Sequence, residues 1–107
     1  MQVRKYYKDF NAETIFDNNE EIDVTRIIVY LKNDMLAFID IMDESTKNVL
    51  INQIHNGKDL KIKDNFTSGR KRELNIPREN ITMIEINENV ILGEDDFQEG
   101  NKQAMVN

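Results

Sequence analysis

The chain has 107 residues, of which 39% are apolar and 32% charged, with a formal net charge of −6 and no cysteine. This length is typical of a single domain with a thin hydrophobic core. The lack of cysteine excludes disulfides, thiolate metal sites and cysteine nucleophiles, and it fits a reducing cytoplasm. The sequence has neither the apolar run of a signal peptide nor the roughly 20 apolar residues of a membrane-spanning helix. We therefore expect a soluble cytoplasmic protein with no membrane partner.

The first 22 residues predict two short strands. Val3 to Tyr7 is typical of an edge strand, because Lys5 and Lys8 supply charges that discourage edge-to-edge association. Residues 13–16 predict a second short strand, and the Asp-Asn-Asn sequence of residues 17–19 predicts a turn.

The strongest strand pattern spans residues 23–31, DVTRIIVYL, and continues in residues 35–42, MLAFIDIM. Apolar residues alternate along both segments, and Asn33 and Asp34 lie between them, which predicts a β-hairpin. The opposite faces carry apolar residues as well, including Ile28 and Phe38. This pattern favours a closed or sandwiched sheet that is covered on both sides.

A single helix is expected after this hairpin, over about residues 46–56. Ser45 is the expected N-cap, and Gly57 is placed to adopt the left-handed conformation that ends a helix. The only histidine, His55, falls in the last turn, where a partly cationic ring suits the helix dipole. A strand over residues 49–54 is the alternative.

The remaining strands are expected at residues 60–63, 70–76 and 81–86, where apolar and polar residues alternate. The predicted fold is therefore mainly β (α+β), a small six- to seven-stranded curled β-barrel with one α-helix. Residues 1–92 would form the domain, and residues 93–107 an acidic, flexible tail. The expected core residues come from the helix and most of the strands: Ile27, Val29, Leu31, Ile39, Ile41, Leu50, Ile54, Leu60, Ile62, Leu74, Ile76 and Ile84.

The sharpest local contrast in the sequence is a basic segment in an acidic chain. Residues 58–78 hold seven basic and three acidic side chains, a net charge of +4, whereas the rest of the chain sums to −10. The run DNFTSGRKRELNIPREN of residues 64–80 overlaps most of this segment. Such a concentration of positive charge indicates an anion-binding surface. The candidate nucleic-acid-binding residues are Lys58, Lys61, Lys63, Phe66, Arg70, Lys71, Arg72 and Arg78.

The alternative is that these basic residues only keep the protein soluble, and this alternative stays open. The expected geometry of two neighbouring strands supports the anion-binding interpretation. Lys61 and Lys63 share one face of a strand, and the connection over residues 64–69 is short enough to place Arg70, Lys71 and Arg72 beside them as one exposed positive surface. Phe66 lies in that connection, where an exposed ring could stack on a base. Arg72 is expected at the strand mouth, where it can reach water.

No other pattern indicates chemistry as clearly. Asp34, Asp40, Asp43 and Glu44 could together bind a hard cation, but their spacing matches no calcium loop, and a solvated acidic surface explains them as well. No phosphate-binding glycine loop, nucleophile elbow or dinucleotide fingerprint is present. We expect no enzymatic activity, no metal and no cofactor.

Three segments resemble the PrgU family, small proteins carried on conjugative plasmids of Gram-positive cocci. They are DVTRIIVYLKND (residues 23–34), NGKDLKIKDNF (residues 56–66) and GRKRELNIPRENI (residues 69–81). The resemblance implies a six-stranded, PUA-like barrel with one helix, together with RNA binding and control of plasmid-transfer genes. It carries no functional residues to this chain.

Two functions follow as expectations. The first is an RNA-binding regulatory module of a conjugative plasmid or other mobile element, which binds the phosphate backbone through residues 58–78. The second is a protein-interaction module, an accessory or inhibitor protein that acts on a host or plasmid-encoded protein through its acidic surface.

Overall fold

The computed structural model describes residues 2–8, 15–17, 20–65, 69–94 and 96. Within these ranges the fold is mainly β (α+β), as expected, with one α-helix, α1 (Glu44–His55). The strands are β1 (Gln2–Tyr7), β2 (Glu21–Leu31), β3 (Met35–Ile41), β4 (Leu60–Asn65), β5 (Lys71–Ile76) and β6 (Ile81–Gly93). Two 3-10 helices, η1 (Ile15–Asp17) and η2 (Arg78–Asn80), complete the described elements.

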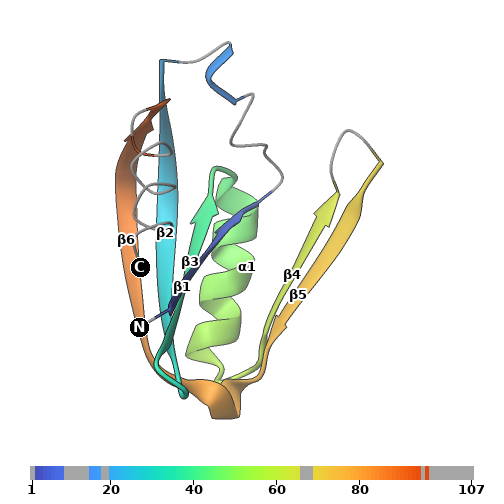
Figure 1. Ribbon diagram of the computed structural model, residues 1–107. Helices are drawn as coiled ribbons and strands as arrows, with labels where there is room; N and C mark the ends of the chain where they lie inside the picture. Colours follow the sequence, from blue (N-terminus) through green and yellow to red (C-terminus); the bar gives the residue numbers. More distant parts are fainter. Residues whose placement is uncertain (1, 9–14, 18–19, 66–68, 95, 97–107) are drawn as a thin grey trace.

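The strands pair in two sheets (Figure 1). The larger sheet has the order β1-β3-β2-β6, in which β1 runs parallel to β3 and the other pairs are antiparallel. The predicted hairpin of β2 and β3 is confirmed, and Asn33 and Asp34 turn the chain with φ angles of 68° and 59°. The expected strand at Val3–Tyr7 is also confirmed as an edge strand, β1.

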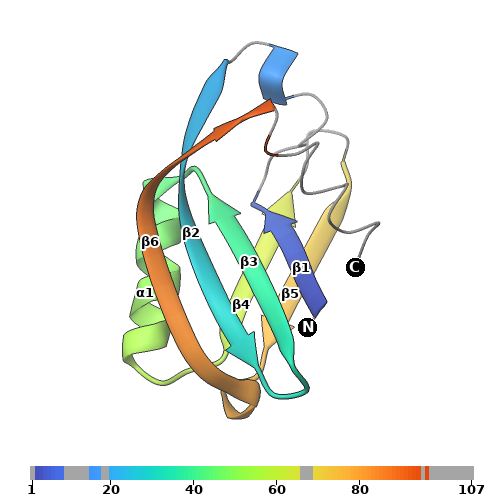
Figure 2. The same cartoon turned by 60° about the vertical axis from the view of Figure 1, so that its left-hand side comes forward.

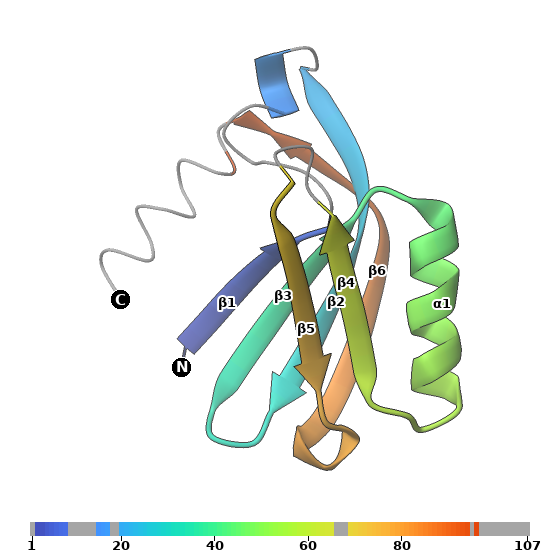
Figure 3. The ribbon, with the colours of Figure 1, turned by 90° about the vertical axis from the view of Figure 1, so that its right-hand side faces the viewer.

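The second layer consists of α1 and the antiparallel pair β4–β5, which lie side by side against one face of the larger sheet (Figures 1 and 3). α1 lies beside β4 and also reaches β6, where Lys47 Nζ is 3.3 Å from Glu88 Oε1. The helix thus fills the gap between the β6 and β4 edges. The described pairings form two separate sheets, so the expected closed barrel is not confirmed.

The main core lies between these two layers. Eight of the expected core residues are buried there, together with Ala37, and the other four pack against them half-buried. The buried eight are Ile27, Val29, Ile39, Ile41, Leu50, Leu60, Ile62 and Ile76, and the half-buried four are Leu31, Ile54, Leu74 and Ile84. The face assignment made from the alternation of residues in β2 to β5 was therefore right.

A second apolar cluster was not expected. It joins Ile22, Val24 and Leu92, with Ile15 and Phe16 of η1 packed against it. Val24 and Ile27 are separated by an odd number of positions, so they point to opposite faces of β2. The predicted strand at residues 13–16 is wrong at Ile15 and Phe16, because these residues form a 3-10 turn that covers this cluster.

Strand β6 is longer than expected, and its irregularity explains why. The β2–β6 register shifts between Val24 and Arg26, where β6 contains an extra residue, and Asn89 has a φ of 58°. This bulge interrupts the alternation after Ile86, but the strand continues to Gly93 (Figure 2). Of the predicted tail, residue 95 and residues 97–107 lie outside the described residues.

Asp43, not the expected Ser45, caps the N-terminus of α1. Its carboxylate accepts hydrogen bonds from the Thr46 hydroxyl, the Ser45 hydroxyl and the Thr46 backbone N–H, which together lower the pKa of Asp43 to about 2. At the other end Gly57 is left-handed (φ 66°) as expected. The backbone N–H groups of Gly57 and Lys58 close the last turn by donating to Ile54 and Gln53.

Candidate nucleic-acid interface

The register of β4 and β5 sets the two faces of this strand pair. Lys61 pairs with Asn75, Lys63 with Glu73, and Asn65 with Lys71. Residues directly opposite one another project from the same side of an antiparallel pair. Lys61, Lys63 and Lys71 therefore lie on one outer face, which we call the lysine face, and all three are exposed. The expected antiparallel pairing that brings these cations together is confirmed.

The lysine face carries one acidic residue, Glu73, opposite Lys63. Diagonal neighbours on such a pair are about 7–8 Å apart, a spacing that applies to Lys63 and Lys71. Within the described part of the chain, none of the three lysines forms an ion pair. Their ammonium groups are exposed and leave a net positive charge on this face.

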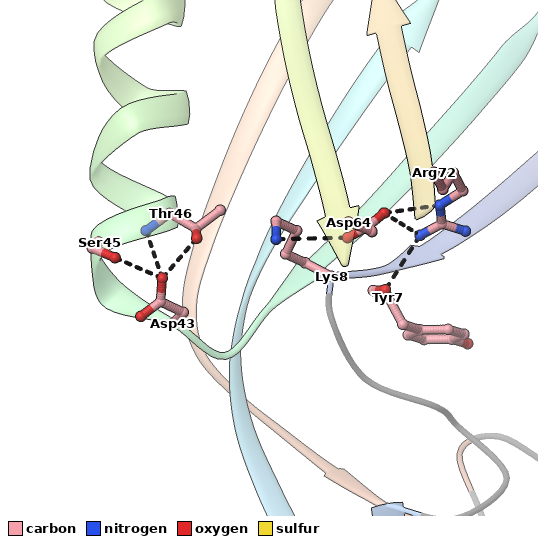
Figure 4. Close-up of polar contacts among 7 residues, drawn as sticks. All are labelled: Tyr7, Lys8, Asp43, Ser45, Thr46, Asp64 and Arg72. Carbon is pink, nitrogen blue, oxygen red and sulfur yellow. Dashed lines mark hydrogen bonds and ion pairs between the residues drawn. The ribbon is translucent and has the colours of Figure 1, made fainter. Parts of the chain in front are cut away.

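Arg72 does not join the lysine face, contrary to the expectation that it reaches water. It lies on the inner face, where it pairs with Asp64, and its side chain is only 28% exposed. Its Nη2 and Nε atoms are 2.7 and 2.8 Å from Asp64 Oδ2 (Figure 4). Asp64 is 1% exposed, and a carboxylate buried to that degree requires a cation beside it.

Three further contacts fix this cluster between the two sheets, and Figure 4 shows the first two. Arg72 donates to the backbone oxygen of Tyr7 over 3.3 Å, and Lys8 Nζ is 3.7 Å from Asp64 Oδ1. The Arg72 guanidinium also lies 5.5 Å from the centre of the Tyr6 ring. Arg72 thus tethers β5 to β4 and to the end of β1, and its role is structural.

The other predicted residues lie toward the two ends of the strand pair. Arg70 is exposed immediately before β5, next to Lys71. Lys58 and Arg78 are exposed at the opposite end, on either side of the Leu60–Ile76 pair, where the Arg78 backbone N–H donates to Asp59 over 2.8 Å. Phe66 lies outside the described residues. The predicted basic segment therefore runs along β4–β5, with Arg72 withdrawn from it.

An ion pair on the far face of the larger sheet escaped the sequence analysis. Arg26 donates to both carboxylate oxygens of the fully buried Asp40, over 2.8 and 3.1 Å, and lies 5.1 Å from the Phe38 ring centre. The hydrogen bond to Asp40 raises the pKa of Arg26. Burial and the Asp40 charge raise the pKa of the neighbouring Tyr7. Asp40 follows Leu36 and Phe38 at every second position, and an acid in an apolar series is the signal that could have indicated this pair.

The acidic residues considered for a cation site have other roles. Asp40 pairs with Arg26, and Asp43 caps α1. Across the described ranges, no group of three or more metal-ligating side chains comes together. The described helices include none that is long and apolar enough to cross a membrane.

The chain matches no known family model, and no curated protein or solved structure shows significant similarity to it.

Proposed function

We propose that this protein is a non-enzymatic RNA-binding module that holds a phosphate backbone on the lysine face. The observation that carries the proposal is the gathering of Lys61, Lys63 and Lys71 on one exposed surface of a chain whose net charge is −6. Exposed lysines without carboxylate partners bind phosphates and release the counterions condensed on a nucleic acid. The acidic remainder of the surface repels a polyanion and thereby restricts it to this face.

The ends of the strand pair extend the proposed contact surface. Arg70 is exposed next to Lys71 at one end, and Lys58 and Arg78 are exposed at the other, so we include all three among the proposed phosphate contacts. Phe66, which belongs to the connection between β4 and β5, remains a proposed stacking residue. Arg72 is not included, because it forms an ion pair with the buried Asp64.

The biological setting is proposed from the resemblance to the PrgU family. The described residues form six strands and one helix, the same number as in the PUA-like barrel of that family. For a barrel of this kind, α1 would bridge the edges β6 and β4, and the Arg72–Tyr7 contact would bridge the edges β5 and β1. On this basis the module would act in the cytoplasm and regulate genes of a conjugative plasmid or another mobile element.

Fluorescence anisotropy with a labelled single-stranded RNA tests the proposal. At low salt the wild-type protein should bind, and the Lys61/Lys63/Lys71→Ala variant should bind at least about tenfold more weakly, because three phosphate contacts are lost. Glu73→Gln removes the one acid of the lysine face and should tighten binding. Lys5→Ala, on the other side of the larger sheet, is the matched control and should leave binding unchanged.

The affinity for RNA should fall in the lysine variant and rise in the glutamate variant, and these opposite changes make the test specific. Equal affinities for the wild type and the triple variant would reject the lysine face as the site. No binding by the wild type at low salt would reject RNA as the ligand.

A second candidate function is a protein-interaction module that acts through the acidic surface. Its support is a hollow at the far end of β2 and β6, which is lined by Glu20, Glu21, Glu94 and Asp96 together with Ile91, and Ile91 is 52% exposed. An exposed apolar side chain in an acidic hollow suits a basic, amphipathic partner segment. Crosslinking to nuclease-treated extract should yield a product that Glu20/Glu21/Glu94→Gln abolishes and that Glu79→Gln retains.

A further inference from the structure

The edges of the two sheets approach each other on one side of the molecule, where β1 faces β5. At one end of this seam Arg72 donates to the Tyr7 backbone oxygen and closes it. Toward the other end β1 and β5 leave between them a cavity of about 250 Å³, lined by residues of β1, β3 and β5, the end of β2 and the two neighbouring turns. Ligand pockets for drug-sized molecules measure about 300–1,000 Å³, so this cavity suits a smaller group such as one planar ring system.

The walls of the cavity combine three kinds of chemistry. Leu36, Ala37, Leu74 and Ile76 provide apolar surface, and Tyr6 provides an aromatic ring that the Arg72 guanidinium contacts. Asn33, Asn75 and Asn80 also belong to the lining and bring polar atoms that can both donate and accept hydrogen bonds. Apolar surface suits the faces of a nucleobase, and amides suit its edge.

The charges at the cavity are all positive. Arg4 and Lys32 belong to its lining and are exposed, whereas none of its described lining residues is a carboxylate. An anionic group attached to the bound ring would therefore be favoured at the rim. This complementarity distinguishes a nucleotide from an uncharged apolar ligand.

The cavity adjoins the lysine face through one residue. Asn75 lines the cavity and is also paired directly with Lys61 on the outer side of β4–β5. A nucleic acid whose backbone lies along the lysine face therefore passes the cavity mouth. Only an unstacked base can enter such a cavity, and single-stranded RNA supplies unstacked bases.

We propose that this cavity binds one nucleobase of a single-stranded RNA, with Arg4 and Lys32 contacting the adjoining phosphate. The inference rests on the proposed function, because the base would belong to the RNA that the lysine face holds. From the outer side of β5, at the cavity mouth, the Asn75 side chain would contact the edge of the base and so provide the preference for particular bases that the lysine face lacks.

NMR titrations with small probes locate the binding site without relying on the lysine face. The four nucleoside 5′-monophosphates should each be compared with ribose 5-phosphate, which has the phosphate and sugar but no base. We expect at least one nucleotide to shift the signals of Ala37, Leu74 and the Tyr6 ring. Ribose 5-phosphate should shift only Arg4 and Lys32. Equal shifts of Ala37 and Leu74 with ribose 5-phosphate, or nucleotide shifts confined to the lysine face, would overturn the inference.

Variants at exposed positions test the roles without disturbing the core. Arg4→Ala and Lys32→Ala should each weaken nucleotide binding several-fold and leave binding of the uncharged nucleoside unchanged, whereas Lys5→Ala should affect neither. Asn75→Leu should reduce the difference in affinity among the four nucleotides. Unchanged nucleotide affinity in both Arg4→Ala and Lys32→Ala would overturn the assigned phosphate contacts.

An RNA octamer separates this inference from the function on which it rests. Octamer binding that depends on the lysine face but leaves the cavity signals unshifted overturns the cavity inference and keeps the proposed function. Cavity shifts with mononucleotides but no octamer binding overturn the proposed function and indicate a free nucleotide as the ligand. A basic peptide binds neither the cavity nor the lysine face on this account, and cavity shifts with such a peptide would contradict it.

Discussion

Arg72 of β5 and Asp64 of β4 face each other across the strand pair and form an ion pair of 2.7 Å on its inner side. The same guanidinium donates to the Tyr7 backbone oxygen, so one side chain connects the two-stranded sheet to the edge of the larger one. Of the adjacent cations in the Arg70–Arg72 sequence, Lys71 points outward and Arg72 inward. The proposed binding role of Lys71 and the structural role of Arg72 thus belong to adjacent residues.

We expect Arg72→Ala to destabilise the protein by about 2–3 kcal/mol. Breaking a buried ion pair costs about 3–5 kcal/mol. We expect a smaller loss here because Arg72 is partly exposed and because Lys8 still lies 3.7 Å from Asp64. Urea unfolding measures the difference. Lys71→Ala, at the exposed neighbouring position, is the matched control and should cost less than about 0.5 kcal/mol. Similar costs for the two variants would mean that the pair does not hold the sheets together.

The Asp43 cap should make stability depend on pH under acid conditions. The pKa of Asp43 is lowered from 3.8 to about 2 by its bonds to Thr46 and Ser45, so folding favours the charged form. The charged Asp43 therefore stabilises the fold above about pH 4, and this stabilisation is lost as the pH falls through about 2. Asp43→Asn keeps a capping side chain without the charge. The melting-temperature difference between wild type and Asp43→Asn should therefore shrink from pH 5 to pH 2, and a constant difference would contradict the cap assignment.

The two faces of the larger sheet should respond differently to truncation. Ile39 is 1% exposed in the core, and Ile39→Ala should cost about 2–4 kcal/mol. Met83 lies in the same sheet but is 52% exposed, so Met83→Ala should cost less than about 0.5 kcal/mol. Urea unfolding of both variants checks the assignment. Comparable costs would show that a further contact covers the face that carries Met83.

The alternation of apolar residues predicted the hairpin, the helix and most of the core, because each local pattern has one way to bury its apolar face. Two errors arose where a local feature depends on distant residues. The bulge at Asn89 hid the last part of β6, and the cluster around Ile22 and Leu92 draws Ile15 and Phe16 into a 3-10 turn. Neither the bulge nor this packing can be predicted from the residues next to it in the sequence.

The candidate site was predictable to the same extent. Period-two alternation placed Lys61, Lys63 and Lys71 outward, and the short connection predicted their antiparallel pairing. The alternation also placed Arg72 inward, but the sequence did not indicate that Asp64, opposite it, is buried and requires its charge. Burial of an ionisable side chain depends on the packing of both sheets, and a single strand pattern does not contain that information.

The salt dependence of RNA binding tests the central claim most directly. Each phosphate contact to single-stranded RNA contributes about −0.7 to the slope of log K against log salt concentration, so three lysine contacts contribute about −2. Anisotropy titrations from low to moderate salt give this slope for the wild type and for Lys61/Lys63/Lys71→Ala. The lysine face predicts a wild-type slope steeper by about 2 than that of the triple variant. Equal slopes for the two proteins would contradict it.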